Sequence, residues 1–146
     1  MLRSVGAAIV GLLTVGVVVF GLQAVGSGFH PLPEGLDPMS PDDAEAFAAH
    51  LAAMPAISWA IAFASELVGA FLGAIAAGWI AQDRGRLVAG IIVGIALLGS
   101  VNDWTSFDHP LWFIIGQLVA YPIVLMGAWV VLGTWGPIAS GASEAG

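Results

Sequence analysis

Four long apolar stretches divide the chain, and polar segments separate them. They cover residues 5–26, 57–81, 87–101 and 111–135. An apolar run of about 20 residues is long enough to cross the hydrocarbon layer of a membrane as an α-helix. The third run, with fifteen residues, rises only about 22 Å and needs its flanking residues or a thinner bilayer to span. The pattern predicts an all-α integral membrane protein, a bundle of four transmembrane helices.

A short amphipathic helix is predicted between the first two spans. Residues 28–40 are rich in proline and lack helical periodicity, which is typical of a loop. Ser40 suits a helix N-cap, Pro41 suits the first helical position, and Asp43 completes a capping-box pattern. Apolar residues then recur at helical spacing, so we expect residues 41–53 to form a helix on the outer membrane surface.

Length and composition fit a single membrane domain. Of the 146 residues, 59% are hydrophobic and 9% are charged, and the mean hydropathy is +0.97. These values exclude a disordered chain and an ordinary soluble domain. We expect one domain over residues 1–136 and a flexible tail over residues 137–146. The first run is longer than the roughly 7 to 15 residues of a signal-peptide core, so we interpret it as a span.

The basic residues indicate how the chain is oriented. There are three of them, Arg3 before the first span and Arg84 and Arg86 between the second and third spans. The positive-inside rule places both sites in the cytoplasm. Both termini are then cytoplasmic, and the acidic loop after the first span faces outward.

Charge and motif content exclude several classes of function. The net charge is −7 and the chain has no cysteine. Nucleic acid is therefore not an expected partner, and disulfides, thiolate metal sites and thiol redox chemistry are excluded. The sequence also lacks the nucleophile elbow, the His-Glu-x-x-His pair and the phosphate-binding loop, so we do not expect an enzyme or a cofactor.

One carboxylate, Glu66, lies near the middle of the second span. Steps of three and four residues place small side chains on its face of the helix: Ala62, Gly69, Gly73 and Ala77. Such a small-residue face lets two helix backbones approach closely, and Gly90 and Gly94 repeat the spacing in the third span. The pattern predicts that Glu66 faces protein and not lipid.

Counting residues from the ends of the spans places other polar groups at the depth of Glu66. They are Thr14, Tyr121 and the carbonyl of Leu118, which Pro122 deprives of its helical partner. We therefore predict a polar layer near the membrane midplane. Two interpretations of Glu66 stay open. It is either a neutral carboxyl that hydrogen-bonds between helices, or a residue that carries a proton or binds a cation.

The histidines are expected at the outer side of the membrane. His30 and His50 belong to the acidic loop and its helix, and His109 has Asp103 and Asp108 beside it. Histidine and carboxylate suit zinc, so His30, His109 and the two aspartates are weak candidates for metal ligands. None of them has the fixed local spacing of a metal motif. In the alternative interpretation His109 caps the fourth span and the aspartates are solvated.

Residues 109–113, His-Pro-Leu-Trp-Phe, open the last span after a helix that carries Gly69 and Gly73. In this layout, over residues 29–129, the chain resembles small uncharacterised four-span bacterial membrane proteins. The resemblance implies a four-helix fold and a bacterial inner membrane. It carries over no activity.

Two functions are consistent with these features. We expect an accessory or assembly protein that lies in the lipid bilayer and contacts another membrane protein, or a second copy of itself, through its glycine faces. The alternative is a small proton- or cation-coupled transporter or channel that uses Glu66. The two functions differ in one respect. A transporter admits water to Glu66 from one side, whereas an accessory protein buries Glu66 away from water.

Overall fold

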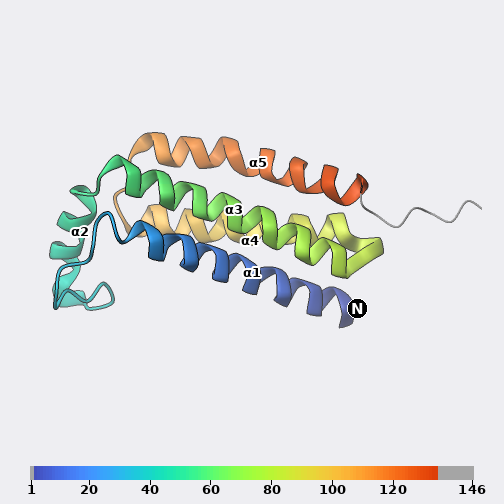
Figure 1. The fold of residues 1–146 in the computed structure, drawn as a ribbon, viewed down its shortest axis with the longest axis horizontal. Helices are drawn as coiled ribbons and strands as arrows, with labels where there is room; N and C mark the ends of the chain where they lie inside the picture. The colour runs from blue at the N-terminus through green and yellow to red at the C-terminus, as the bar shows by residue number, and fades with distance from the viewer. Residues whose placement is uncertain (1, 135–146) are drawn as a thin grey trace, which may run out of the picture.

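The protein is helical throughout the part that the structure describes. The computed structural model describes residues 2–134. These form, in order, α1 (Leu2–Gly26), η1 (Pro41–Asp43), α2 (Ala44–Ala52), α3 (Ala56–Ala81), η2 (Gln82–Arg84), α4 (Gly85–Ser106) and α5 (Leu111–Thr134). Figure 1 shows the long helices α1, α3, α4 and α5 side by side, with α2 at one end. The all-α prediction is confirmed for these residues, and the predicted tail lies outside them.

Three helical stretches of the described chain are long and apolar enough to cross a membrane. They are Leu2–Gly26, Ala56–Ser106 and Leu111–Gly133. The second stretch comprises α3, η2 and α4. Helices α3 and α4 run in opposite directions because the chain reverses at η2 (Figure 1). These stretches suggest a membrane protein.

Helix α3 lies at the centre of the packing. Helices α1, α4 and α5 all contact it, and the contact between α1 and α3 is the most extensive. The core is built largely from small side chains, including Ala70, Ala74 and Ala77 of α3. Small residues allow helix axes to come close, and close packing replaces the hydrophobic drive that lipid does not supply.

Glycines bring α1 and α3 into backbone contact. A Cβ added to Gly73 would lie 2.7 Å from the carbonyl oxygen of Gly11, and one added to Gly11 would lie 2.9 Å from the carbonyl oxygen of Gly73. One turn away, a Cβ on Gly69 would lie 3.2 Å from the Val15 carbonyl oxygen. The small-residue face of α3 is therefore occupied by α1. By contrast, nothing lies within 4 Å of a Cβ added to Gly90, and the same is true of Gly94.

The amino end of α1 is tied to the reversal between α3 and α4. The Arg3 guanidinium donates from Nε to the Ile80 carbonyl oxygen at 2.6 Å and from Nη1 to Oε1 of Gln82. Gln82 has φ 52°, a left-handed conformation that is uncommon for residues other than glycine. Three residues later, a Cβ on Gly85 would lie 2.6 Å from the Gly78 carbonyl oxygen, so this tight reversal requires glycine.

Helix α4 is longer than the apolar run that predicts it. It spans 22 residues, Gly85–Ser106, in place of residues 87–101, and its rise of about 33 Å is enough for a hydrocarbon layer of about 30 Å. The extension includes residues 102–106, which belong to the polar segment predicted between the third and fourth apolar runs. Both Thr105 and Ser106 donate their hydroxyl protons to the Asn102 carbonyl, at 2.9 and 2.8 Å. Such bonding within the helix lets a polar turn continue it.

The predicted surface helix forms in two pieces, and its capping box does not form. A 3₁₀ turn, η1, precedes α2, and the Ser40 side chain makes no capping hydrogen bond. The carboxylate of Asp43 instead accepts the backbone N–H of Asp37 at 2.9 Å. The loop thus competes successfully for the side chain that the capping box requires.

Candidate functional site

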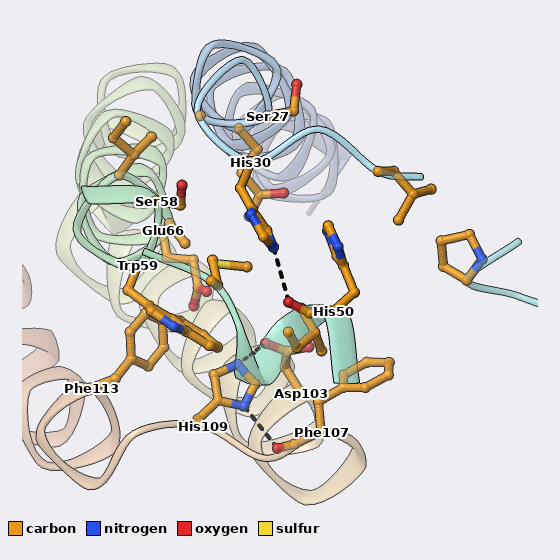
Figure 2. A pocket seen from close by; sticks show the side chains of 18 of the residues that line it. Ser27, His30, His50, Ser58, Trp59, Glu66, Asp103, Phe107, His109 and Phe113 are labelled. Atoms are coloured by element: carbon orange, nitrogen blue, oxygen red, sulfur yellow. Dashed lines mark hydrogen bonds and ion pairs between the residues drawn. The ribbon is translucent and has the colours of Figure 1, made fainter. Parts of the chain in front are cut away.

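A cavity of about 540 Å³ lies at the end of the molecule where α2 and the loops meet the long helices. Glu66 and Asp103 line it together with all three histidines, and its wall includes five aromatic side chains: Phe20, Phe47, Trp59, Phe107 and Phe113. Figure 2 shows the Glu66 side chain extending from α3 into this space. Glu66 lies about two helical turns, or roughly 10 Å, further along α3 than Trp59. We call this space the outer cavity.

A chain of hydroxyl groups from two other helices reaches the Glu66 carboxyl group. Ser100 of α4 donates its hydroxyl proton to Oε2 of Glu66. The Tyr121 hydroxyl of α5 lies 2.7 Å from the same serine oxygen. Ser100 has one hydroxyl proton, and when this goes to Glu66, Tyr121 must be the donor to Ser100. Both hydroxyl protons then point towards the carboxyl group.

Gln117 of α5 supplies a second donor group. The Trp104 indole N–H, which can only donate, bonds to Oε1 of Gln117 at 2.9 Å. This bond fixes the amide so that Nε2 is directed away from Trp104. Gln117 is completely buried, and its Nε2 has no hydrogen-bond partner among the described residues. The side chain is nevertheless close enough to Glu66 to interact with its carboxyl group. A carboxylate at this position therefore accepts from the Ser100 hydroxyl and has the Gln117 side chain nearby.

The described arginines lie far from this carboxyl group. Arg3, Arg84 and Arg86 all belong to the end of the molecule opposite the outer cavity (Figure 1). Hydrogen bonds stabilise a carboxylate, but they leave its charge in place, and an uncompensated charge away from water is unfavourable. An ionised Glu66 would therefore attract a cation from the outer cavity.

His109 and Asp103 form an ion pair within the outer cavity. Nε2 of the histidine lies 2.9 Å from Oδ2 of the aspartate, and Nδ1 donates to the Phe107 carbonyl oxygen at 2.9 Å. Both ring nitrogens thus face acceptor oxygens. The ring also contacts Trp59 edge to face, with 5.1 Å between the centroids. The pair is held rigidly by these contacts.

The other two histidines stack on each other beside the entrance (Figure 2). The ring centroids of His30 and His50 are 4.0 Å apart, with 17° between the planes. Nε2 of His30 donates to the His50 carbonyl oxygen at 2.9 Å. Burial lowers the pKa of His50, and the neighbouring His30 lowers it further. The stack joins the loop after α1 to α2.

The structure brings together some of the predicted site residues and separates others. Glu66 and Tyr121 are linked through Ser100. The Thr14 hydroxyl instead donates to the Val10 carbonyl of its own helix at 2.9 Å. Leu118 is 51% exposed on α5 and does not contribute to this hydrogen-bond chain.

Sequence reasoning missed Ser100 and Gln117. A signal was present for Gln117, because an amide inside an apolar span is unfavourable unless its groups are bonded. Ser100 stands at the end of the third apolar run, where a serine is unremarkable. Ser100 is identified only by the structure, in which its side of α4 faces α3.

The weak metal candidates do not converge on one point. Asp103 and His109 form a pair, whereas His30 stacks on His50. Among residues 2–134, no group of three or more histidine, aspartate or glutamate side chains has the geometry to hold a metal ion. Asp108 lines a separate pocket next to α2.

Comparisons with known proteins add no relative. A scan against protein-family models found no match, and searches of the curated proteins and of the solved structures found none either. The fold and its apolar stretches define an all-α chain with the features of a membrane protein. Its function has to be inferred from the residues around Glu66.

Proposed function

We propose that this chain is a four-span protein of the bacterial inner membrane that binds a small cation at Glu66 from the outer side, as a proton- or cation-coupled transporter does. One observation carries the proposal: Glu66 lines a cavity of about 540 Å³, which is large enough to hold water or a small ligand. The Ser100 hydroxyl, which donates to Glu66, suits a carboxylate. Because the described arginines lie at the other end, a bound cation would supply the missing positive charge.

The proposed topology follows from helix length and charge. Helices α1, α3, α4 and α5 each exceed 20 residues, and about 20 suffice for a span. The arginines gather at the end that carries the reversal at η2, which the positive-inside rule assigns to the cytoplasm. The outer cavity then opens to the outside, both termini are cytoplasmic, and the surrounding partner is the lipid bilayer.

Cysteine labelling tests this topology without background, because the chain has no cysteine. Ser40→Cys, in the outer loop, should react with an impermeant maleimide in intact cells. Asp83→Cys, in η2, should react only after the membrane is opened. Labelling of both positions from outside would refute the proposed orientation.

Cation binding is tested on the purified protein in lipid nanodiscs. Tetramethylammonium should perturb the tryptophan fluorescence saturably, because Trp59 lines the outer cavity. Glu66→Gln should abolish the response, since the amide retains an acceptor for Ser100 but has no charge. Glu34→Gln, the same change at an exposed loop position, is the matched control. Absence of binding, or equal binding by the wild type and Glu66→Gln, would overturn the proposal.

A second function, an accessory or assembly role without nucleic-acid contact, is supported by another observation. The added Cβ atoms at Gly90 and Gly94 meet nothing within 4 Å, so a close-packing face of α4 is open in the described chain. We propose this face for contact with another membrane protein or a second copy. Gly90→Leu with Gly94→Leu should abolish the specific complex recovered from native membranes, while Gly21→Leu should keep it. Recovery of the same complex from all three proteins would exclude this role.

A further inference from the structure

A second cavity, of about 420 Å³, lies between α1 and α4. We call it the lateral cavity. It shares three lining residues with the outer cavity, Gln23, Glu66 and Asp103. Its remaining wall is mostly apolar, with Val15 and Val19 from α1 facing Ile95 and Ala96 from α4. Glu66 therefore lies where a polar entrance and an apolar side opening meet.

Missing side chains create the lateral cavity. Gly16 of α1 and Gly99 of α4 both line it, and a Cβ added to either would meet nothing within 4 Å. Five residues earlier in α1, a Cβ on Gly11 would lie 3.0 Å from Cδ1 of Ile92 in α4. The helices thus touch near the arginine end and part towards Glu66. Exposed Leu12 and Ile95 flank the opening, so in the proposed membrane it would face acyl chains.

We propose that the site takes an amphiphilic cation, with an ammonium group beside Glu66 in the outer cavity and an apolar chain in the lateral cavity between α1 and α4. This inference rests on the proposed function and names its ligand class. The volumes of both cavities fall within the range of about 300 to 1,000 Å³ that is typical of ligand sites. The aromatic rings of Trp59 and Phe113 in the cavity wall can attract the positive charge of an organic ammonium group.

The lining distinguishes this ligand from an inorganic ion. Hard cations such as Ca²⁺ require about six to eight oxygen ligands. No described group of three or more histidine or carboxylate residues has metal-binding geometry. An inorganic ion would also leave the apolar lateral cavity empty, whereas a chain attached to the ammonium group fills it.

The test compares two probes that differ only in chain length. Tetramethylammonium and octyltrimethylammonium are titrated against the protein in nanodiscs made from phosphatidylglycerol, followed by tryptophan fluorescence. The double variant Gly16→Leu with Gly99→Leu closes the lateral cavity without meeting a described neighbour at Cβ. Gly21→Leu adds the same side chain elsewhere on α1, at a glycine whose added Cβ also meets nothing within 4 Å. It serves as the matched control.

We expect the double variant to weaken octyltrimethylammonium binding by about tenfold or more, because lost burial of about two methylenes already amounts to that factor. Tetramethylammonium should bind the wild type and the double variant within about twofold, since it occupies only the outer cavity. Gly21→Leu should change neither affinity. Comparing variants at one chain length removes the effect of probe partitioning into the bilayer.

The outcomes distinguish a failure of the amphiphile inference from a failure of the proposed function. If tetramethylammonium binds in a Glu66-dependent way but octyltrimethylammonium binds the double variant as tightly as the wild type, the proposed function stands and the amphiphile inference is overturned. Equal weakening of both probes overturns it as well. If neither probe binds the wild type, the proposed function itself fails.

A final experiment distinguishes two sources of an ammonium group attached to apolar chains, a resident lipid and a free amphiphile. Phosphatidylethanolamine carries an ammonium group on apolar chains, as a free amphiphile does. Adding it to the nanodiscs should raise the apparent Kd for octyltrimethylammonium if a resident lipid occupies the site. An unchanged Kd assigns the site to a free amphiphile. Both results support the ligand class.

Discussion

Replacing Gly73 by alanine tests whether α1 and α3 touch through their backbones. The new Cβ would lie 2.5 Å from Cγ2 of Val15 and 2.7 Å from the carbonyl oxygen of Gly11. The valine can rotate, but the carbonyl belongs to the backbone, so the helices must separate. Overpacking of this kind costs about 1 to 3 kcal/mol, and the better helix propensity of alanine offsets up to about 1 kcal/mol. With the full offset, we expect a net destabilisation of up to about 2 kcal/mol.

The measurement is reversible unfolding in mixed micelles, with thermal stability as a second readout. The control is Gly21→Ala on α1, where the added Cβ meets nothing within 4 Å. It should leave stability unchanged or raise it by up to about 1 kcal/mol through helix propensity alone. In a chain of this size, each kcal/mol corresponds to about 2 to 4 °C in Tm. Shifts of the same sign and size for both variants would refute the backbone contact.

Two further predictions concern the site. Tyr121→Phe removes the donor to Ser100, so we expect a loss of about 0.6 to 1.7 kcal/mol in unfolding free energy. Ser100→Ala should lose more, because it deprives two groups of a partner, and the reverse order would contradict the donor chain. The lowered pKa of His50 means that the unfolded chain binds its proton more readily. Its stabilising contribution is therefore complete above its usual pKa of 6.5 and is lost as the pH falls through the lowered pKa of the folded state. Unfolding compared at about pH 8 and about pH 5 should show this loss in the wild type and not in His50→Asn.

The long helices could be predicted from the sequence because an apolar run of membrane length has few other structures open to it. In a lipid environment every backbone group must bond within its own segment, which favours a helix. The end of α4 could not be read in this way. Whether Thr105 and Ser106 bond within the helix or to water is a local competition that residue type leaves open.

The site was predictable as far as depth determines it. Residue counting predicts similar depths for Glu66 and Tyr121, and in the structure Ser100 links these two side chains from α3 and α5. Thr14 has a comparable depth, but it bonds within its own helix. Depth follows from counting residues, whereas facing depends on how each helix is rotated by its neighbours. The lateral cavity was still harder to predict from the sequence, because it lies where Gly16 of α1 and Gly99 of α4 line opposite walls.

The bonds from Arg3 to Ile80 and Gln82 attach one end of α1 to the reversal between α3 and α4. From this fixed point the helix extends over 25 residues, or about 37 Å. If α1 turned by about 5° about the attached end, its far end would move by about 3 Å, roughly two residues of helical rise. That end carries Phe20 and Gln23, which line the outer cavity, while the middle of α1 lines the lateral one. Because α1 lines both cavities, any displacement of this helix would change both openings to Glu66 together, and the outer cavity would change more.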